Sequence, residues 1–136
     1  MEYQHLKVHA GPVTKVTLSR PELRNAMSDV TLRSLTLVFQ AIAKDPEVRV
    51  VIVTGGGKDF CAGADINWMK DSGKLPPEEG KKDARLLADM LQAVDECPVP
   101  VIVAAQGNVF GGGLGLVAAC DIALLADDAK MSFSEC

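Results

Sequence analysis

Two glycine-rich segments are the places in this sequence where the backbone itself could do chemistry. They occupy residues 61–65 (CAGAD) and 111–113 (GGG), each after a run rich in β-branched residues and before a helical pattern. Glycine lets a backbone approach a ligand closely and turn its amides outward. Two helix N-termini directed at one point would stabilise an oxyanion that develops during a reaction.

Other glycine-rich motifs do not fit these segments. A dinucleotide-binding fingerprint requires glycine where Leu116 stands. A P-loop requires Ser or Thr where Asp59 follows Lys58, and glycine where Ile52 stands. The G-x-S-x-G motif of lipases does not occur. Either loop, taken alone, would more often be a tight turn.

The elements around these loops alternate between strands and helices. Residues 6–10 and 13–18 predict a hairpin, 19–27 a polar loop, and 107–113 a further loop. Ser28 is a candidate N-cap for an amphipathic helix that ends before Pro46. Further strands are expected at 48–54, 101–105, 122–125 and 131–133, and further helices at 86–94 and 114–119. Residues 71–80 are expected to form a mobile polar excursion, and residues 48–54 suit a strand covered on both faces. This rhythm predicts an α/β fold.

The bulk composition narrows the classes of partner. The chain has 136 residues, 48% hydrophobic and 24% charged, with a formal net charge of −4. This balance argues against a nucleic-acid or anionic-membrane surface, although backbone amides could still bind an anion. Apolar runs such as 99–105 are far shorter than the ~20 residues of a membrane span. We expect a cytoplasmic protein whose four cysteines form neither a zinc site nor a disulfide framework.

Three motifs in register resemble those of the enoyl-CoA hydratase/isomerase (crotonase) family. Residues 20–27 (RPELRNAM) are similar to its R-P-x-x-x-N-A-hydrophobic signature. Residues 60–66 (FCAGADI) are similar to its F-x-A-G-A-D-[LI] loop. Residues 107–122 are similar to its G-x-x-x-G-G-G-x-x-L-x-x-x-C-D-[IL] segment. The similarity covers essentially the whole chain.

The resemblance implies a crotonase-like spiral of ββα units that holds an acyl-CoA thioester. The thioester carbonyl would lie between the backbone amides of Ala64 and Gly112, in an oxyanion hole. The residues that match the family's substrate-binding positions are Glu22, Arg24, Ala62, Asp65, Ile66, Trp68 and Gly111. Trp68 would lie near the acyl chain. No metal and no cofactor are expected, apart from the coenzyme A that the substrate itself carries.

The carboxylates decide which reaction the resemblance implies. Hydratases of this family typically place two glutamates against one water. Gly115 stands at the first of these positions and Glu135 at the second. A branch resembling methylglutaconyl- or carboxygeranoyl-CoA hydratases would use Glu135 with a water held otherwise. A Δ3,Δ2-enoyl-CoA isomerase would need only this one base, and in other branches the base lies beyond residue 136. We expect a hydratase first and an isomerase second.

The chain stops directly after an expected strand, at residues 134–136. We therefore interpret residues 1–136 as the N-terminal portion of a core domain, apparently truncated, without the C-terminal helical part that builds trimers. The resemblance implies a homo-oligomer, a trimer or hexamer, for the full-length protein. A hypothesis of another class is an inert fragment that binds acyl-CoA without performing chemistry.

Overall fold

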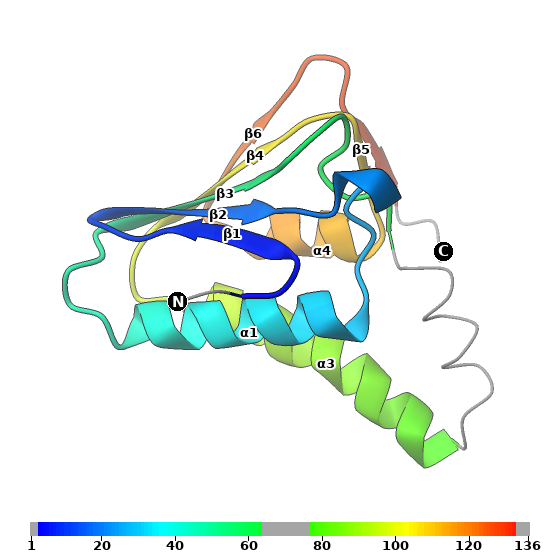
Figure 1. The fold of residues 1–136 in the computed structure, drawn as a ribbon, viewed down its shortest axis with the longest axis horizontal. Helices are drawn as coiled ribbons and strands as arrows, with labels where there is room; N and C mark the ends of the chain where they lie inside the picture. Colours follow the sequence, from blue (N-terminus) through cyan, green and yellow to red (C-terminus); the bar gives the residue numbers. More distant parts are fainter. Residues whose placement is uncertain (1–2, 64–76, 133–136) are drawn as a thin grey trace.

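The computed structural model describes residues 3–63 and 77–132, which form a parallel sheet backed by helices (Figure 1). Two strands, a 3-10 helix and a long helix come first: β1 (Leu6–His9), β2 (Val13–Leu18), η1 (Pro21–Leu23) and α1 (Asp29–Ala43). The elements that follow are β3 (Val50–Gly55), α3 (Pro77–Asp95), β4 (Val101–Ala105), β5 (Asn108–Phe110), α4 (Gly112–Ala119), β6 (Ile122–Leu125) and β7 (Lys130–Ser132). The α/β class predicted from the sequence is confirmed.

The described strands form two sheets. The larger sheet has the order β1-β2-β3-β4-β6, with β1 antiparallel to β2 and every other pair parallel. In the smaller sheet β5 pairs in parallel with β7, and Cys61 forms an isolated parallel bridge with Val109. The chain leaving β3 and the chain leaving β4 therefore lie side by side.

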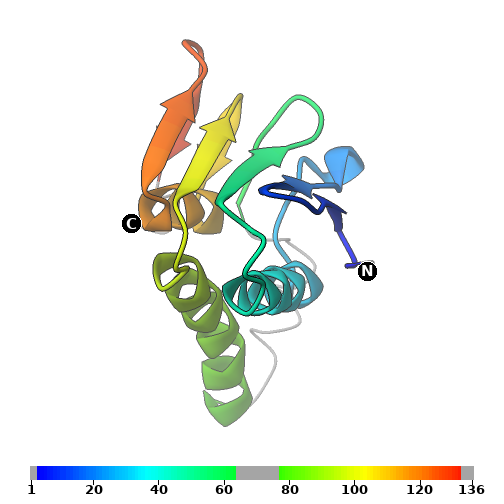
Figure 2. The same cartoon turned by 90° about the vertical axis from the view of Figure 1, so that its left-hand side faces the viewer.

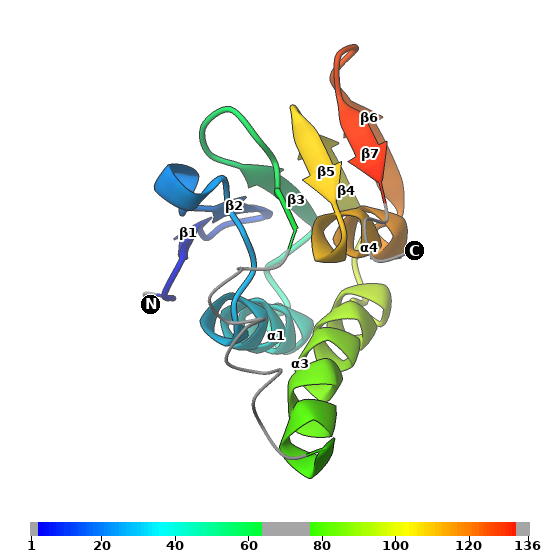
Figure 3. The same cartoon turned by 90° about the vertical axis from the view of Figure 1, so that its right-hand side faces the viewer.

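Helix α1 forms because its apolar residues recur at helical spacing and its start is capped. Ser28 takes the extended backbone of an N-cap, and its N–H donates to the Thr31 hydroxyl at 3.4 Å. Leu32, Leu35 and Phe39 are buried, so one face of the helix enters the core. Viewed from either side, α1 and α3 lie below the sheet (Figures 2 and 3).

The core lies between the larger sheet and these helices. Every second residue of β3 and β4 is fully buried, as expected for strands that have one face against helices. These residues are Val51, Val53, Val101 and Val103. From the helical side, Met90 of α3 and Leu116 of α4 are equally buried. Among the described residues, no helix is both long and apolar enough to cross a membrane.

Several boundaries differ from those expected. Residues 77–80 belong to α3 rather than to a mobile excursion, since proline is well tolerated in the first turn of a helix. Residues 71–76 lie outside the described residues. Within the expected loop 107–113, Asn108–Phe110 form β5. Their sequence pattern for a strand is weak, and pairing with β7 stabilises the extended conformation. Strand β3 is fully buried on one face only, since Val50 and Ile52 on the other are half-buried.

Candidate active site

The first glycine-rich loop is fixed against the segment that follows β4. The Phe60 N–H donates to the Gln106 carbonyl at 2.8 Å, and the Cys61 N–H to that of Asn108 at 3.1 Å. In return the Phe110 N–H donates to the Cys61 carbonyl at 3.0 Å. These bonds join the start of the first glycine-rich segment to the chain that leads into the second, about fifty positions later in the sequence.

The second segment turns sharply and begins helix α4. Gly111 has φ 54° and ψ −120°, a backbone that side chains disfavour, and it occupies the N-cap position. Its N–H donates to the Ser132 carbonyl at 2.9 Å, while its carbonyl accepts the Gly115 N–H at 3.1 Å. The N–H groups of a first helical turn have no acceptor within the helix. The Gly112 amide belongs to this turn and is thus suited to an external oxygen.

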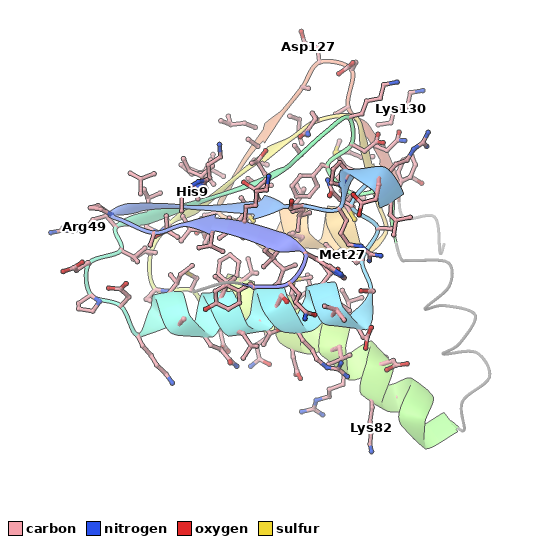
Figure 4. The ribbon with its side chains drawn as sticks, in the orientation of Figure 1. His9, Met27, Arg49, Lys82, Asp127 and Lys130 are labelled. Atoms are coloured by element: carbon pink, nitrogen blue, oxygen red, sulfur yellow. The ribbon has the colours of Figure 1, made fainter. Side chains whose placement is uncertain are left out.

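Helix α4 approaches the first loop so closely that only glycine fits at the contact. A Cβ on Gly113 would lie 2.5 Å from the Cys61 Cβ and 2.9 Å from its Sγ. At Gly112 a Cβ would lie 3.3 Å from the Met27 Sδ and 3.6 Å from the Leu87 Cδ1. Residue Gly112 therefore lies close to the side chains of Met27 and Leu87. Met27 comes from the chain between η1 and α1 (Figure 4), and Leu87 from α3.

The segment between η1 and α1 holds the first loop from its other side. Asn25 adopts φ 56°, a left-handed conformation that asparagine tolerates. Its Nδ2 donates to the carbonyls of Gly56 at 2.8 Å and Asp59 at 2.9 Å. Two backbone bonds complete the clamp. The Ala62 N–H donates to the Arg24 carbonyl at 3.0 Å and the Met27 N–H to the Gly63 carbonyl at 2.8 Å.

The thiol of Cys61 lies between the two loops but is not a nucleophile at neutral pH. Its side chain is fully buried, and burial raises its pKa to about 11. Hydrogen bonding with backbone at Gly63 and Gly113 opposes this shift without cancelling it. The neutral thiol is a packing group against Gly113. Within residues 60–63 and 107–113, the backbone amides are thus the groups suited to act on a substrate oxygen.

A known family matches most of the sequence that forms this site. A family model described as enoyl-CoA hydratase/isomerase matches residues 9–136. The chain belongs to this family. The resemblance of its three motifs is thereby confirmed, and so is the crotonase-like fold.

Curated relatives within the family carry both reaction names. The chain is 38% identical to the mitochondrial Δ(3,5)-Δ(2,4)-dienoyl-CoA isomerase of Rattus norvegicus, over 98% of this chain and 44% of that protein. It is 34% identical to a putative enoyl-CoA hydratase of Thermus thermophilus, over 96% of this chain and 51% of that protein. The chain thus spans about half the length of these relatives.

A solved structure agrees with this assignment. The crystal structure of a putative enoyl-CoA hydratase/isomerase (crotonase) from Legionella pneumophila superposes with a TM-score of 0.93 at 34% identity. The match covers 96% of this chain and 51% of that structure. The family's fold therefore accounts for nearly every described element.

The structure brings together some of the predicted site residues of this family member. Gly111 and Gly112 lie at the start of α4, and Ala62 lies in the adjoining loop. Arg24 backs that loop through its carbonyl, while its exposed guanidinium lies 3.6 Å from the Asp59 carboxylate. Glu22 lies in η1 with an exposed side chain. The predictions for Ala64, Asp65, Ile66, Trp68 and Glu135 lie outside the described residues.

Gly115, which the motif resemblance places at the first glutamate position, lies in the second turn of α4. A Cβ there would lie 3.5 and 3.7 Å from the two methyl carbons of Leu91, which is ordinary packing distance. Helix α3 thus borders this position with an apolar side chain. In place of a carboxylate, the chain presents glycine and leucine here.

Sequence reasoning missed two residues that shape the site, Asn25 and Asp59. Asn25 is part of the motif at residues 20–27, and Asp59 is the residue that excludes a P-loop, but neither was predicted to belong to the site. A signal was available for Asn25, because asparagine is enriched at left-handed positions and in turns. For Asp59 the sequence carries no such signal, because its partners come from distant segments.

Proposed function

We propose that the protein is an enoyl-CoA hydratase in which backbone amides stabilise a thioester enolate. The observation that supports this most is the Gly112 amide at the start of α4, beside the clamped loop 61–63. Acyl-CoA thioesters are the substrates of the reactions that its relatives' names describe. Ala64 would supply the second amide, as the family motif implies.

The proposed reaction adds water across the double bond conjugated to the thioester. The water oxygen bonds to C3 while a base takes its proton, and the π electrons move onto the thioester oxygen. Two amide donors stabilise this oxyanion more than the neutral carbonyl, so they lower the barrier. Protonation of C2 then restores the thioester carbonyl and gives the 3-hydroxyacyl-CoA.

Glu135 carries the proton transfers in this proposal. It takes the proton from water and, as a carboxylic acid, supplies one to C2. Gly115 brings no second carboxylate, so the water would be held by other groups. The acyl-CoA itself would contact Glu22, Arg24, Ala62, Asp65, Ile66, Trp68 and Gly111, with no further cofactor. We also propose that the full-length protein is a homo-oligomer, a trimer or hexamer.

An isomerase is the second candidate, and a specific observation favours it. The chain has one glutamate at the family's two catalytic positions, and one base suffices to carry a proton between C2 and C4. Relatives at 38–39% identity bear the name dienoyl-CoA isomerase. The third candidate, from another class, is a fragment that binds acyl-CoA without turnover.

Assays of the purified protein, expressed from its complete reading frame, distinguish these candidates. We expect hydration of a 2-enoyl-CoA, and a fall in kcat of about 100-fold or more in Glu135→Gln. The matched control is Glu47→Gln, an exposed residue in the loop before β3, which should retain full activity. Conversion of 3-enoyl-CoA without hydration would make the isomerase correct. Unchanged hydration in Glu135→Gln would contradict the catalytic assignment.

A further inference from the structure

Asp59 is a buried carboxylate at the point where three separate segments of the chain meet. It precedes the first glycine-rich loop, and only 7% of its surface is exposed. A buried carboxylate is costly unless it is paired and hydrogen-bonded, so its partners reveal what it holds.

One carboxylate oxygen reaches β5, the strand that leads into the second glycine-rich segment. The Asn108 N–H donates to the Asp59 Oδ1 at 3.0 Å. The neighbouring Gly107 allows this approach. It has φ +62°, and a Cβ on it would lie 2.8 Å from the same Oδ1 and 3.0 Å from the Asp59 Cα. The side chain therefore bonds directly to the first residue of β5, three residues before Gly111.

The other groups of Asp59 reach the segment between β2 and α1. Its Oδ2 lies 3.6 Å from the Arg24 Nε, and its carbonyl accepts the Asn25 Nδ2 at 2.9 Å. Arg24 in turn accepts the Ala62 N–H, so the ion pair and the backbone clamp belong to the same contact. Asp59 thus connects all three segments that surround the candidate site.

We infer that Asp59 is a positioning residue, whose carboxylate fixes the amide at Gly112 relative to the loop 61–63. This inference rests on the proposed function for its effect on catalysis. Asp59 takes no part in the bond changes. It holds the two loops in position through its contacts with Asn108 and Arg24. An oxyanion hole formed by two loops requires their relative position to be held, and a displacement of about 1 Å can cost about 100-fold in rate.

Three variants test this role in the purified protein. Asp59→Ala removes the acceptor, and we expect kcat for a 2-enoyl-CoA to fall about 10- to 100-fold while KM changes less than about threefold. Asp59→Asn retains an oxygen that can accept the Asn108 N–H, so it should restore kcat to within about threefold of wild type. Asp59→Leu, which has a similar branched shape and no acceptor, replaces alanine in the comparison if Asp59→Ala does not fold.

Asp121→Ala is the matched control. The Asp121 Oδ2 accepts the Val101 N–H at 2.8 Å, which is the same kind of bond at the opposite end of β4. Its removal should lower Tm and leave kcat unchanged at a temperature where the variant is folded. Equal kcat values in wild type and Asp59→Ala would overturn the inference, as would equal losses in Asp59→Ala and Asp59→Asn. If neither Asp59→Ala nor Asp59→Leu folds, the carboxylate serves folding and the positioning role is also overturned.

Amide hydrogen exchange separates this inference from the proposed function. In Asp59→Ala we expect the amides of residues 60–63 and 108–111 to exchange faster than in wild type. In Asp121→Ala we expect wild-type exchange rates in both segments. Unchanged exchange at these segments would refute the coupling, whatever the enzyme's activity. A wild-type protein that converts no enoyl-CoA would instead refute the proposed function, and the exchange comparison would still decide the role of Asp59.

Discussion

At the scale of single residues, the buried thiol of Cys61 makes the free energy of unfolding fall as pH rises through the alkaline range. Its folded-state pKa is about 11, against an ordinary value of 9.0. The unfolded thiol therefore ionises first as pH rises. The stabilisation is fully present below pH 9 and is lost between pH 9 and 11. Two pKa units correspond to about 2–3 kcal/mol.

Between pH 9 and 11, the free energy of unfolding should fall by about 2–3 kcal/mol less in Cys61→Ala than in wild type, because alanine does not titrate. Denaturant unfolding at a series of pH values, under reducing conditions, measures this difference. Cys97 and Cys120 are present in both proteins, so their ionisation cancels in the comparison. Parallel pH dependences in the two proteins would contradict the assignment of a buried, neutral Cys61 thiol.

Residue types predicted part of the candidate site. Gly111 and Gly112 could be placed close to a helix start, because the glycine run lies between a strand pattern and a helical pattern and three motifs match the family in register. The roles of Asn25 and Asp59 depend on partners about 30 to 50 positions away. Such contacts follow from the tertiary fold, and no local pattern encodes them. The positions of Ala64 and Glu135 remain predictions from the family motifs.

At the scale of elements, helix α1 carries a sharp contrast between its buried and exposed faces. Leu35 is fully buried against the sheet, whereas Leu37 is 56% exposed on the same helix. We expect Leu35→Ala to lower the free energy of unfolding by about 2–5 kcal/mol, since it leaves a cavity in the core. The matched variant Leu37→Ala should change it by about 0.5 kcal/mol or less. Denaturant unfolding of both variants checks this, and equal losses would contradict the placement of the helix.

Elements with strong periodicity were predictable, and elements defined by pairing were not. Strand β4 occupies the expected residues 101–105, and α1 begins directly after Ser28 as its cap predicts. Strand β5 has only three residues, and its conformation depends on hydrogen bonds to β7 and Cys61. Helix α4 begins at Gly112, two residues before the apolar pattern at Leu114 indicates, because the first turn packs against Cys61 where side chains would clash.

At the scale of the whole molecule, strand β6 presents apolar side chains on the outer edge of the larger sheet. Ile122 is 51% exposed and Leu124 is 60% exposed. Both are in a strand that pairs only with β4 among the described elements. Exposed apolar strands at an edge favour association with other chains. The relatives are about twice as long as this chain, which gives their folds further chain to cover such a surface.

We therefore expect the isolated 136-residue polypeptide to self-associate through this edge. Replacing Leu124 with lysine should reduce its association, because a charge disfavours contact between such edges. Light scattering over a concentration series compares the two polypeptides, with Leu37→Lys on the exposed face of α1 as a control for the same change away from a sheet edge. A monomeric wild-type polypeptide at every concentration would contradict this expectation.

In the proposed reaction, the Gly112 amide stabilises the substrate oxyanion. Gly112→Pro removes that N–H at a helix position where proline is well tolerated. Gly112→Ala keeps the N–H and adds a Cβ that would lie 3.3 Å from the flexible Met27 side chain. The direct measurement is kcat for a 2-enoyl-CoA in both variants. We predict a loss of about 100- to 1000-fold in Gly112→Pro and a much smaller loss in Gly112→Ala. Equal kcat values in the two variants would contradict this role of the Gly112 amide.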